Sequence, residues 1–63
     1  MNFKENFRKF LNPTTKEQLK KALNLKDDRT LRNYANGTRQ PNLEQLEIIK
    51  NVLNCTYDDL LED

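Results

Sequence analysis

The sequence predicts an all-α fold, a compact bundle of five short helices. Apolar residues recur at helical spacing in successive segments, and no segment shows the alternation typical of a strand. Prolines, a single glycine and capping residues separate these segments. A chain of 63 residues has room for one hydrophobic core, so we expect residues 1–63 to form a single domain. A domain of this size buries only about 60% of its unfolded surface, which predicts modest stability.

The first helix is expected at about residues 2–11. Its apolar residues repeat at i, i+4, i+7 and i+8, which places them on one helical face. They are Phe3, Phe7, Phe10 and Leu11. In so small a domain, large aromatic side chains favour the core, and a groove for a partner is the alternative. Asn12-Pro13 ends the helix, because the residue before a proline disfavours helical geometry.

The second helix is expected at about residues 16–24. Thr14 and Thr15 offer an N-cap, and Thr15-x-x-Gln18 has the form of a capping box. The inward residues of this helix are Leu19, Ala22 and Leu23.

A short turn leads to the third helix, expected at about residues 28–36. Either Asp27 or Asp28 can cap this helix and favour its positive end. Leu31 and Tyr34 face inward, with Ala35 at the edge. Gly37 stands where a left-handed residue would end the helix at little steric cost.

The last two helices are expected at about residues 42–53 and 57–62. Asn42 caps the first of them, which carries Leu43, Leu46, Ile49, Val52 and Leu53. Asn54-Cys55 breaks this pattern, and Thr56-x-x-Asp59 begins the final helix. The apolar residues of that helix either close the core or form a two-fold dimer contact. They are Tyr57, Leu60 and Leu61.

The composition argues against an enzyme and against a metal or cofactor. The chain has no histidine, and its single cysteine, Cys55, allows neither an internal disulfide nor a zinc site. General bases and nucleophiles are therefore scarce, and one glycine cannot form a phosphate-cradling loop. No apolar run approaches the length of a membrane span or a signal peptide, so no membrane partner is expected. A lone thiol fits a reducing cytoplasm.

The charge is divided along the chain. Residues 1–40 contain ten basic and four acidic residues, a net charge of +6, whereas residues 41–63 contain one basic and six acidic residues, a net charge of −5. Such a distribution can present a basic face to phosphates while the acidic end stays clear of them. The alternative is a set of ordinary solvated helix faces.

Four motifs in residues 15–61 occur in a specific order and spacing. They are T-K-E-Q-L from Thr15, L-N-L from Leu23, L-R-N-Y-A-N-G from Leu31, and R-Q-P-N-L from Arg39, followed by a helix and Tyr57-Asp-Asp-Leu60. Together they resemble the Cro/C1-type helix-turn-helix family, the XRE-like regulators that include the lambdoid phage repressors and Cro proteins. Lys20 stands where that family usually has alanine, and Asn24 replaces its turn glycine, which asparagine can do at positive φ. The segment 25–30 is longer than usual, which leaves the start of the recognition helix open.

The resemblance implies that helix 28–36 is the recognition helix and enters the major groove of DNA with its N-terminal half. The candidate base-reading residues are Arg29, Arg32, Asn33 and Asp28. Arginine pairs with guanine and asparagine with adenine, while Asp28 either accepts from cytosine or caps the helix. The candidate contacts to the DNA backbone are Thr15, Lys16, Thr30, Asn36, Thr38 and Arg39. For Lys16 and Arg39 an ordinary solvated charge is the alternative.

The function implied is a sequence-specific, DNA-binding transcriptional regulator of the phage or bacterial repressor type. Its partner would be double-stranded operator DNA, bound by a homodimer formed through the C-terminal segment, in the cytoplasm of a bacterial or phage-infected cell. The alternative is an antirepressor or antitoxin-like module on the same fold, which binds another regulator. The acidic C-terminal third and the phenylalanines of the first helix keep this alternative open.

Overall fold

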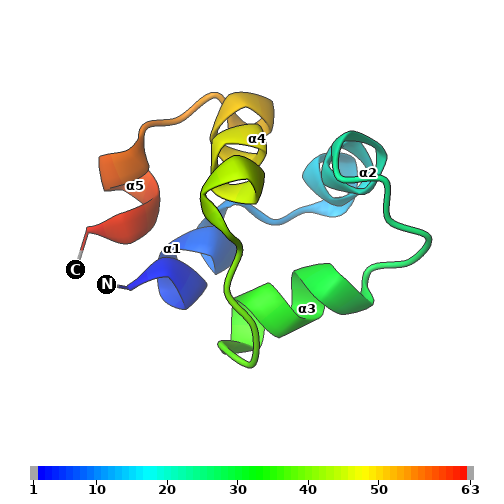
Figure 1. Cartoon of the computed structure of the whole chain (residues 1–63), viewed down its shortest axis with the longest axis horizontal. Coiled ribbons are helices and arrows are strands. Elements are labelled where there is room, and N and C mark those ends of the chain that lie inside the picture. Colours follow the sequence, from blue (N-terminus) through cyan, green and yellow to red (C-terminus); the bar gives the residue numbers. More distant parts are fainter. Residues whose placement is uncertain (1, 63) are drawn as a thin grey trace.

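A computed structural model describes residues 2–62 of the chain, which form five helices (Figure 1). They are α1 (Phe3–Phe10), α2 (Pro13–Ala22), α3 (Arg29–Asn36), α4 (Leu43–Leu53) and α5 (Tyr57–Leu61). The described chain contains no strand, so the expected all-α class is confirmed. In Figure 1, α4 stands between α5 and α2, while α1 packs against both α3 and α5. The molecule measures 30 × 23 × 21 Å.

Three aromatic rings form the centre of the core. Phe3 and Phe7 of α1 stack with their ring centroids 5.1 Å apart. The ring of Tyr34 from α3 meets both of them edge-on, at 6.2 and 6.0 Å. Aromatic pairs prefer such stacked and edge-to-face arrangements. The remaining buried apolar residues are Leu19, Leu31, Leu46, Ile49 and Leu60. Phe3 and Phe7 are thus core residues as expected, whereas Phe10 packs half-buried against the core.

Asn6 joins the two ends of the chain from a buried position. Its side-chain amide donates to the carbonyl oxygens of Leu60 at 3.1 Å and Glu62 at 2.6 Å. The backbone N–H of Asn2 also donates to the carbonyl oxygen of Leu61 at 3.4 Å. These bonds hold α1 against the end of α5, and Figure 1 shows the two termini side by side.

The second helix begins at Pro13, three residues before the expected start, and the expected cap is wrong. Asn12 is the N-cap: its side chain accepts from the Thr15 N–H at 2.9 Å, and the Thr15 hydroxyl accepts from the Asn12 N–H at 2.9 Å. Thr15 is therefore the third residue of α2. The physical reason is Pro13, whose fixed φ suits the first helical position and whose missing N–H needs no partner there.

Left-handed residues end three of the helices. Gly37 has φ 82° after α3, as expected, and Asn24 and Asn54 have φ 58° and 54° after α2 and α4. Beyond Asn24, the Leu25 N–H donates to the Lys20 carbonyl oxygen at 2.8 Å, a bond typical of this kind of helix end. Asn24 thus replaces a glycine at positive φ, as the sequence suggested.

The burial of three apolar residues departs from the pattern of their helices. Ala22 of α2 was expected to face inward, but it is exposed, because α2 packs on α4 mainly through Leu19. Leu43, at the first position of α4, is 84% exposed. Leu60 is fully buried and closes the core, whereas Tyr57 of the same short helix is exposed. The final helix thus contributes to the core through Leu60 and leaves Tyr57 at the surface.

Two further findings concern the described residues 2–62. No helix in this part of the chain is long and apolar enough to cross a membrane. Among the same residues, no group of three or more histidine, cysteine, aspartate and glutamate side chains is placed to hold a metal ion. Cys55 is a half-buried free thiol, and burial raises its pKa, which keeps it protonated at neutral pH.

The buried side-chain amide of Asn6 should contribute more to the free energy of unfolding than an exposed amide does. We expect Asn6→Ala to lower the free energy of unfolding by about 1–3 kcal/mol, because two carbonyl groups lose their donor. Urea denaturation measures the change. Asn2→Ala is the matched control, because its amide bonds only the exposed Glu5 carboxylate, and it should cost less than about 0.5 kcal/mol. Equal losses in the two variants would contradict the role given to Asn6.

Candidate nucleic-acid interface

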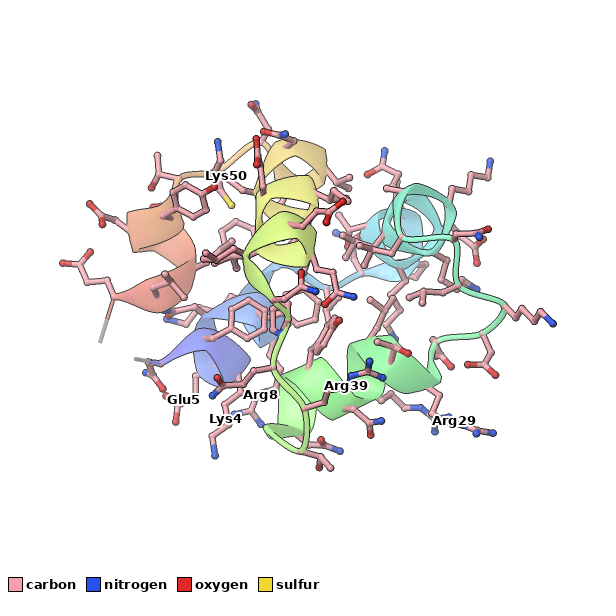
Figure 2. The ribbon with its side chains drawn as sticks, in the orientation of Figure 1. Lys4, Glu5, Arg8, Arg29, Arg39 and Lys50 are labelled. Carbon is pink, nitrogen blue, oxygen red and sulfur yellow. The ribbon has the colours of Figure 1, made fainter. Side chains whose placement is uncertain are left out.

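The third helix presents an open basic face. Leu31 and Tyr34 are each 1% exposed and turn one side of α3 to the core. Arg29 and Arg32, three positions apart, are exposed on the other side. Because residues at this spacing share a helical face, both guanidinium groups project from one side of α3. Figure 2 shows Arg29 at the end of α3 that follows the turn from α2.

Asp28 lies beside Arg32. One of its carboxylate oxygens is 3.7 Å from Nε of Arg32, and the two side chains are 41% and 69% exposed. An exposed ion pair of this length contributes little and opens readily. The pair therefore leaves the outer nitrogens of Arg32 available for two parallel hydrogen bonds to a base edge.

The cap of α3 comes from outside the helix. Asp28 occupies the N-cap position, but its side chain makes no capping hydrogen bond. Oδ1 of Asp27 instead accepts from the Arg29 N–H at 2.9 Å. The sequence left both aspartates open as the cap, and the structure assigns that hydrogen bond to Asp27. The helix itself begins at Arg29, one residue later than expected.

The side chains of Asn33 and Thr30 are less exposed to solvent than those of Arg29 and Arg32. Both are half-buried, which places them at the edges of the exposed face. The carbonyl oxygen of Asn33 accepts from the Arg39 N–H at 3.2 Å, which ties the following loop to α3. Among the candidate base-reading residues, the structure thus exposes Arg29 and Arg32 most.

The start of α2 has fewer hydrogen-bond donors available to a DNA phosphate than its sequence suggested. The Thr15 N–H donates to Asn12 Oδ1, and the Lys16 N–H donates to the Asn12 carbonyl oxygen at 2.9 Å. The Thr15 hydroxyl donates to the carbonyl oxygen of Phe10 at 2.8 Å. These backbone amides are engaged because the helix begins earlier than expected. What remains for a phosphate at these two positions is the side chain of Lys16, which is half-buried.

Lys20 has a local partner that explains a lysine at this half-buried position. Its ammonium lies 2.9 Å from the carboxylate of Glu17, one turn earlier on α2. The hydrogen bond that Lys20 donates to Glu17 lowers the pKa of Glu17 and raises the pKa of Lys20. Lys20 is thus engaged within α2.

Three further candidates are exposed at the end of α3 and in the loop after it: Asn36, Thr38 and Arg39. The side-chain amide of Asn36 lies 2.9 Å from the Thr38 hydroxyl oxygen. Burial raises the pKa of Tyr34, and the positive charge of Arg39 opposes that rise. Arg39 and Tyr34 line a shallow hollow together with Phe3, Lys4, Gly37 and Gln40.

Lys4 is a basic residue at this face that the sequence did not indicate. A Cβ atom on Gly37 would lie 2.8 Å from Cδ of Lys4, so the lysine side chain passes directly over the glycine. Figure 2 shows Lys4 and Arg8 projecting from α1 near the C-terminal end of α3. Their spacing of four residues places them on one face of α1. Nothing in the sequence indicates that this face adjoins the loop after α3.

The acidic residues of the last helix lie at the other end of the molecule. Asp58, Asp59 and Glu62 are exposed on and just after α5. In Figure 1, α5 lies at one end of the long axis, and the turn between α2 and α3 lies at the other. The charge division along the sequence therefore becomes a division in space, which leaves the basic face of α3 free of nearby acidic helices.

Comparison with known protein families finds a match over most of the chain. A family model described as helix-turn-helix covers residues 6–60, which include most of α1 and α5 and all of the helices between them. Searches of curated proteins and of solved structures find no match.

The two aspartates before α3 should differ in their effect on stability. We expect Asp27→Ala to lower the free energy of unfolding by about 0.5–2 kcal/mol, because it removes the side-chain cap of α3. Asp28→Ala should cost less, since its exposed contact with Arg32 is weak. Thermal or urea denaturation of both variants measures the difference. A larger loss from Asp28→Ala would show that Asp28 is the cap.

Proposed function

Since the chain belongs to the Cro/C1-type helix-turn-helix family of DNA-binding transcription regulators, we propose that it reads a specific operator sequence in the major groove with α3. The observation that carries this proposal is the exposed pair Arg29 and Arg32 on a helix anchored by Leu31 and Tyr34. A guanidinium can donate two hydrogen bonds to O6 and N7 of guanine, and these acceptors are accessible in the major groove. Anchoring matters because base reading requires a fixed helix orientation.

The other candidate residues make further contacts with DNA in this proposal. Asn33, at the edge of the face, reads adenine, and Asp28 holds Arg32 or accepts from cytosine. Contacts to the DNA backbone come from the side chains around α3, which set the register without reading sequence. They are Lys16, Thr30, Asn36, Thr38 and Arg39, whereas Thr15 is engaged within the start of α2. The protein acts as a repressor of the phage or bacterial type, in the cytoplasm of a bacterial or phage-infected cell.

We further propose that the protein binds its operator as a two-fold dimer. An apolar patch lies at the start of α4 and along α5, formed by the exposed Leu43 and Tyr57 with the half-buried Pro41 and Leu61. Leu43 stands between two shallow hollows that both include Leu61. A projecting residue beside a hollow on one patch suits a self-complementary two-fold interface. The molecule is 30 Å long, which fits two copies on half-sites about 34 Å apart.

The patch also favours a second candidate function. An exposed apolar surface on a small domain can hold a different protein. If the chain stays monomeric, this patch supports an antirepressor or antitoxin-like module that binds another regulator.

Base reading by α3 can be tested with a randomised DNA library at low and moderate salt. The wild type should enrich a palindromic motif. Arg32→Ala and Asn33→Ala should each lose about 1–3 kcal/mol of discrimination at defined base positions, the range for a bidentate contact. Asn51→Ala, at an exposed position of α4, is the matched control and should leave the motif unchanged. A folded wild type that enriches no motif even at low salt would refute a sequence-reading regulator.

Dimer formation can be tested by replacing Leu43. Because Leu43 is 84% exposed in the single chain, Leu43→Glu should leave the free energy of unfolding of the monomer unchanged. It should raise the dimer dissociation constant at least about tenfold, since burial of a leucine contributes roughly 1.5–3 kcal/mol. Sedimentation equilibrium measures this constant. Asn51→Glu adds the same charge elsewhere on α4 and should have no effect. A dimer that tolerates Leu43→Glu does not form through this patch.

A further inference from the structure

We propose that Lys4 of α1 and Arg39 of the following loop together bind one phosphate of the DNA backbone at the C-terminal end of α3. This inference rests on the proposed function, because it names a further contact to the same DNA. It adds a residue from α1 to a surface otherwise made by α2, α3 and the loop after α3.

The position of Lys4 is set by Gly37. The lysine stem passes over the glycine, where a Cβ atom would lie 2.8 Å from Cδ and 3.6 Å from Nζ of Lys4. Gly37 is also left-handed, with φ 82°, so the same residue ends α3 and leaves room for the lysine. The ammonium group of Lys4 therefore lies at the end of α3.

Arg39 lines the same hollow as Lys4. Both cations line it together with the buried Phe3 and Tyr34 and the exposed Gly37. Within residues 2–62 the ion pairs are Lys20 with Glu17 and Arg32 with Asp28, and neither involves Lys4 or Arg39. Two cations at the rim of an open hollow, with no acidic partner in the described chain, suit an anion.

The dimensions of α3 place DNA phosphates at this hollow. The helix has eight residues, which corresponds to a length of about 12 Å. The major groove is also about 12 Å wide. When the N-terminal half of α3 reads bases, its C-terminal end therefore approaches the phosphates that border the groove.

The charge of Lys4 is needed at this end of the helix. The C-terminus of a helix carries partial negative charge from its unpaired carbonyl groups, which repels a phosphate. Lys4 offsets that charge, and Arg39 supplies a second donor. A lysine that only stabilised the helix end would affect the free energy of unfolding and not the salt dependence of DNA binding.

The test is the salt dependence of DNA affinity in Lys4→Gln. Each phosphate contact contributes about 0.9 to the slope of log affinity against log salt, so this variant should lose about 0.9 in slope. The affinity advantage of the wild type should then shrink about 3.5-fold when salt rises from roughly 50 to 200 mM. The loss should be equal for operator and random DNA, because phosphates carry no sequence information.

Lys9→Gln is the matched control. It removes the same charge from α1, but Lys9 lies beside Asp58, Asp59 and Glu62 on a different side of the helix. Its slope should equal that of the wild type. Lys4→Arg should keep the wild-type slope, because it keeps the charge, and circular dichroism verifies that each variant is folded.

The possible results separate the two proposals. Wild-type protein that does not bind DNA overturns both the proposed function and this inference. Wild-type binding with an unchanged slope in Lys4→Gln, or with equal losses in Lys4→Gln and Lys9→Gln, overturns the phosphate contact and leaves the DNA-binding function standing. A loss in Lys4→Gln with no loss in Lys9→Gln supports the contact.

Discussion

The arrangement of this small domain depends on Tyr34. Its ring meets Phe3 and Phe7 edge-on, so that α3 is held against α1. Its hydroxyl donates to Oε1 of Gln45 at 3.3 Å, and the same oxygen accepts from the Asn42 N–H at 3.1 Å. One side chain of α3 thus contacts the aromatic core and the capping box that begins α4. Because Tyr34 lies on the face of α3 opposite Arg29 and Arg32, these contacts determine the direction in which the arginines point.

The segment from Gly37 to Leu43 joins the three surfaces that we assign to function. Gly37 ends α3, the helix that we propose reads bases, and lies under the side chain of Lys4. Arg39 adds a second cation to the same hollow. A few residues later, the chain exposes Leu43 in the patch proposed for dimer formation. The position of this segment is determined at both ends, by the left-handed glycine and by the capping box of Asn42. A short connection with defined ends would keep the proposed dimer contact close to the proposed DNA-reading face.

Capping interactions matter more in this protein than in a larger domain. Few side chains are fully buried, so the hydrophobic core contributes little to the free energy of unfolding. The cost of unpaired backbone groups at helix ends would be large by comparison. The side chains of Asn12, Asn42 and Thr56 each accept a backbone N–H at the start of a helix, each within a capping box. These local bonds use short polar residues and leave the exposed faces free for other roles.

The sequence by itself determined the helical class, the order of the five helices and most of their ends. These features depend on residues within one or two turns of each other, such as Gly37, Asn42 and the Thr56-x-x-Asp59 box, so a linear pattern contains them. It also separated the buried Leu31 and Tyr34 from the exposed Arg29 and Arg32 through helical periodicity alone.

The tertiary structure alone decided which of several equivalent local partners is used and which distant segments meet. Proline geometry moved the cap of α2 from Thr15 to Asn12, and the path of the preceding turn gave the α3 cap to Asp27. The exposure of Leu43 and the passage of Lys4 over Gly37 result from how α1, α3 and α4 pack. Such contacts join residues far apart along the chain. Their positions depend on the packing of whole helices, which no local pattern of residues specifies.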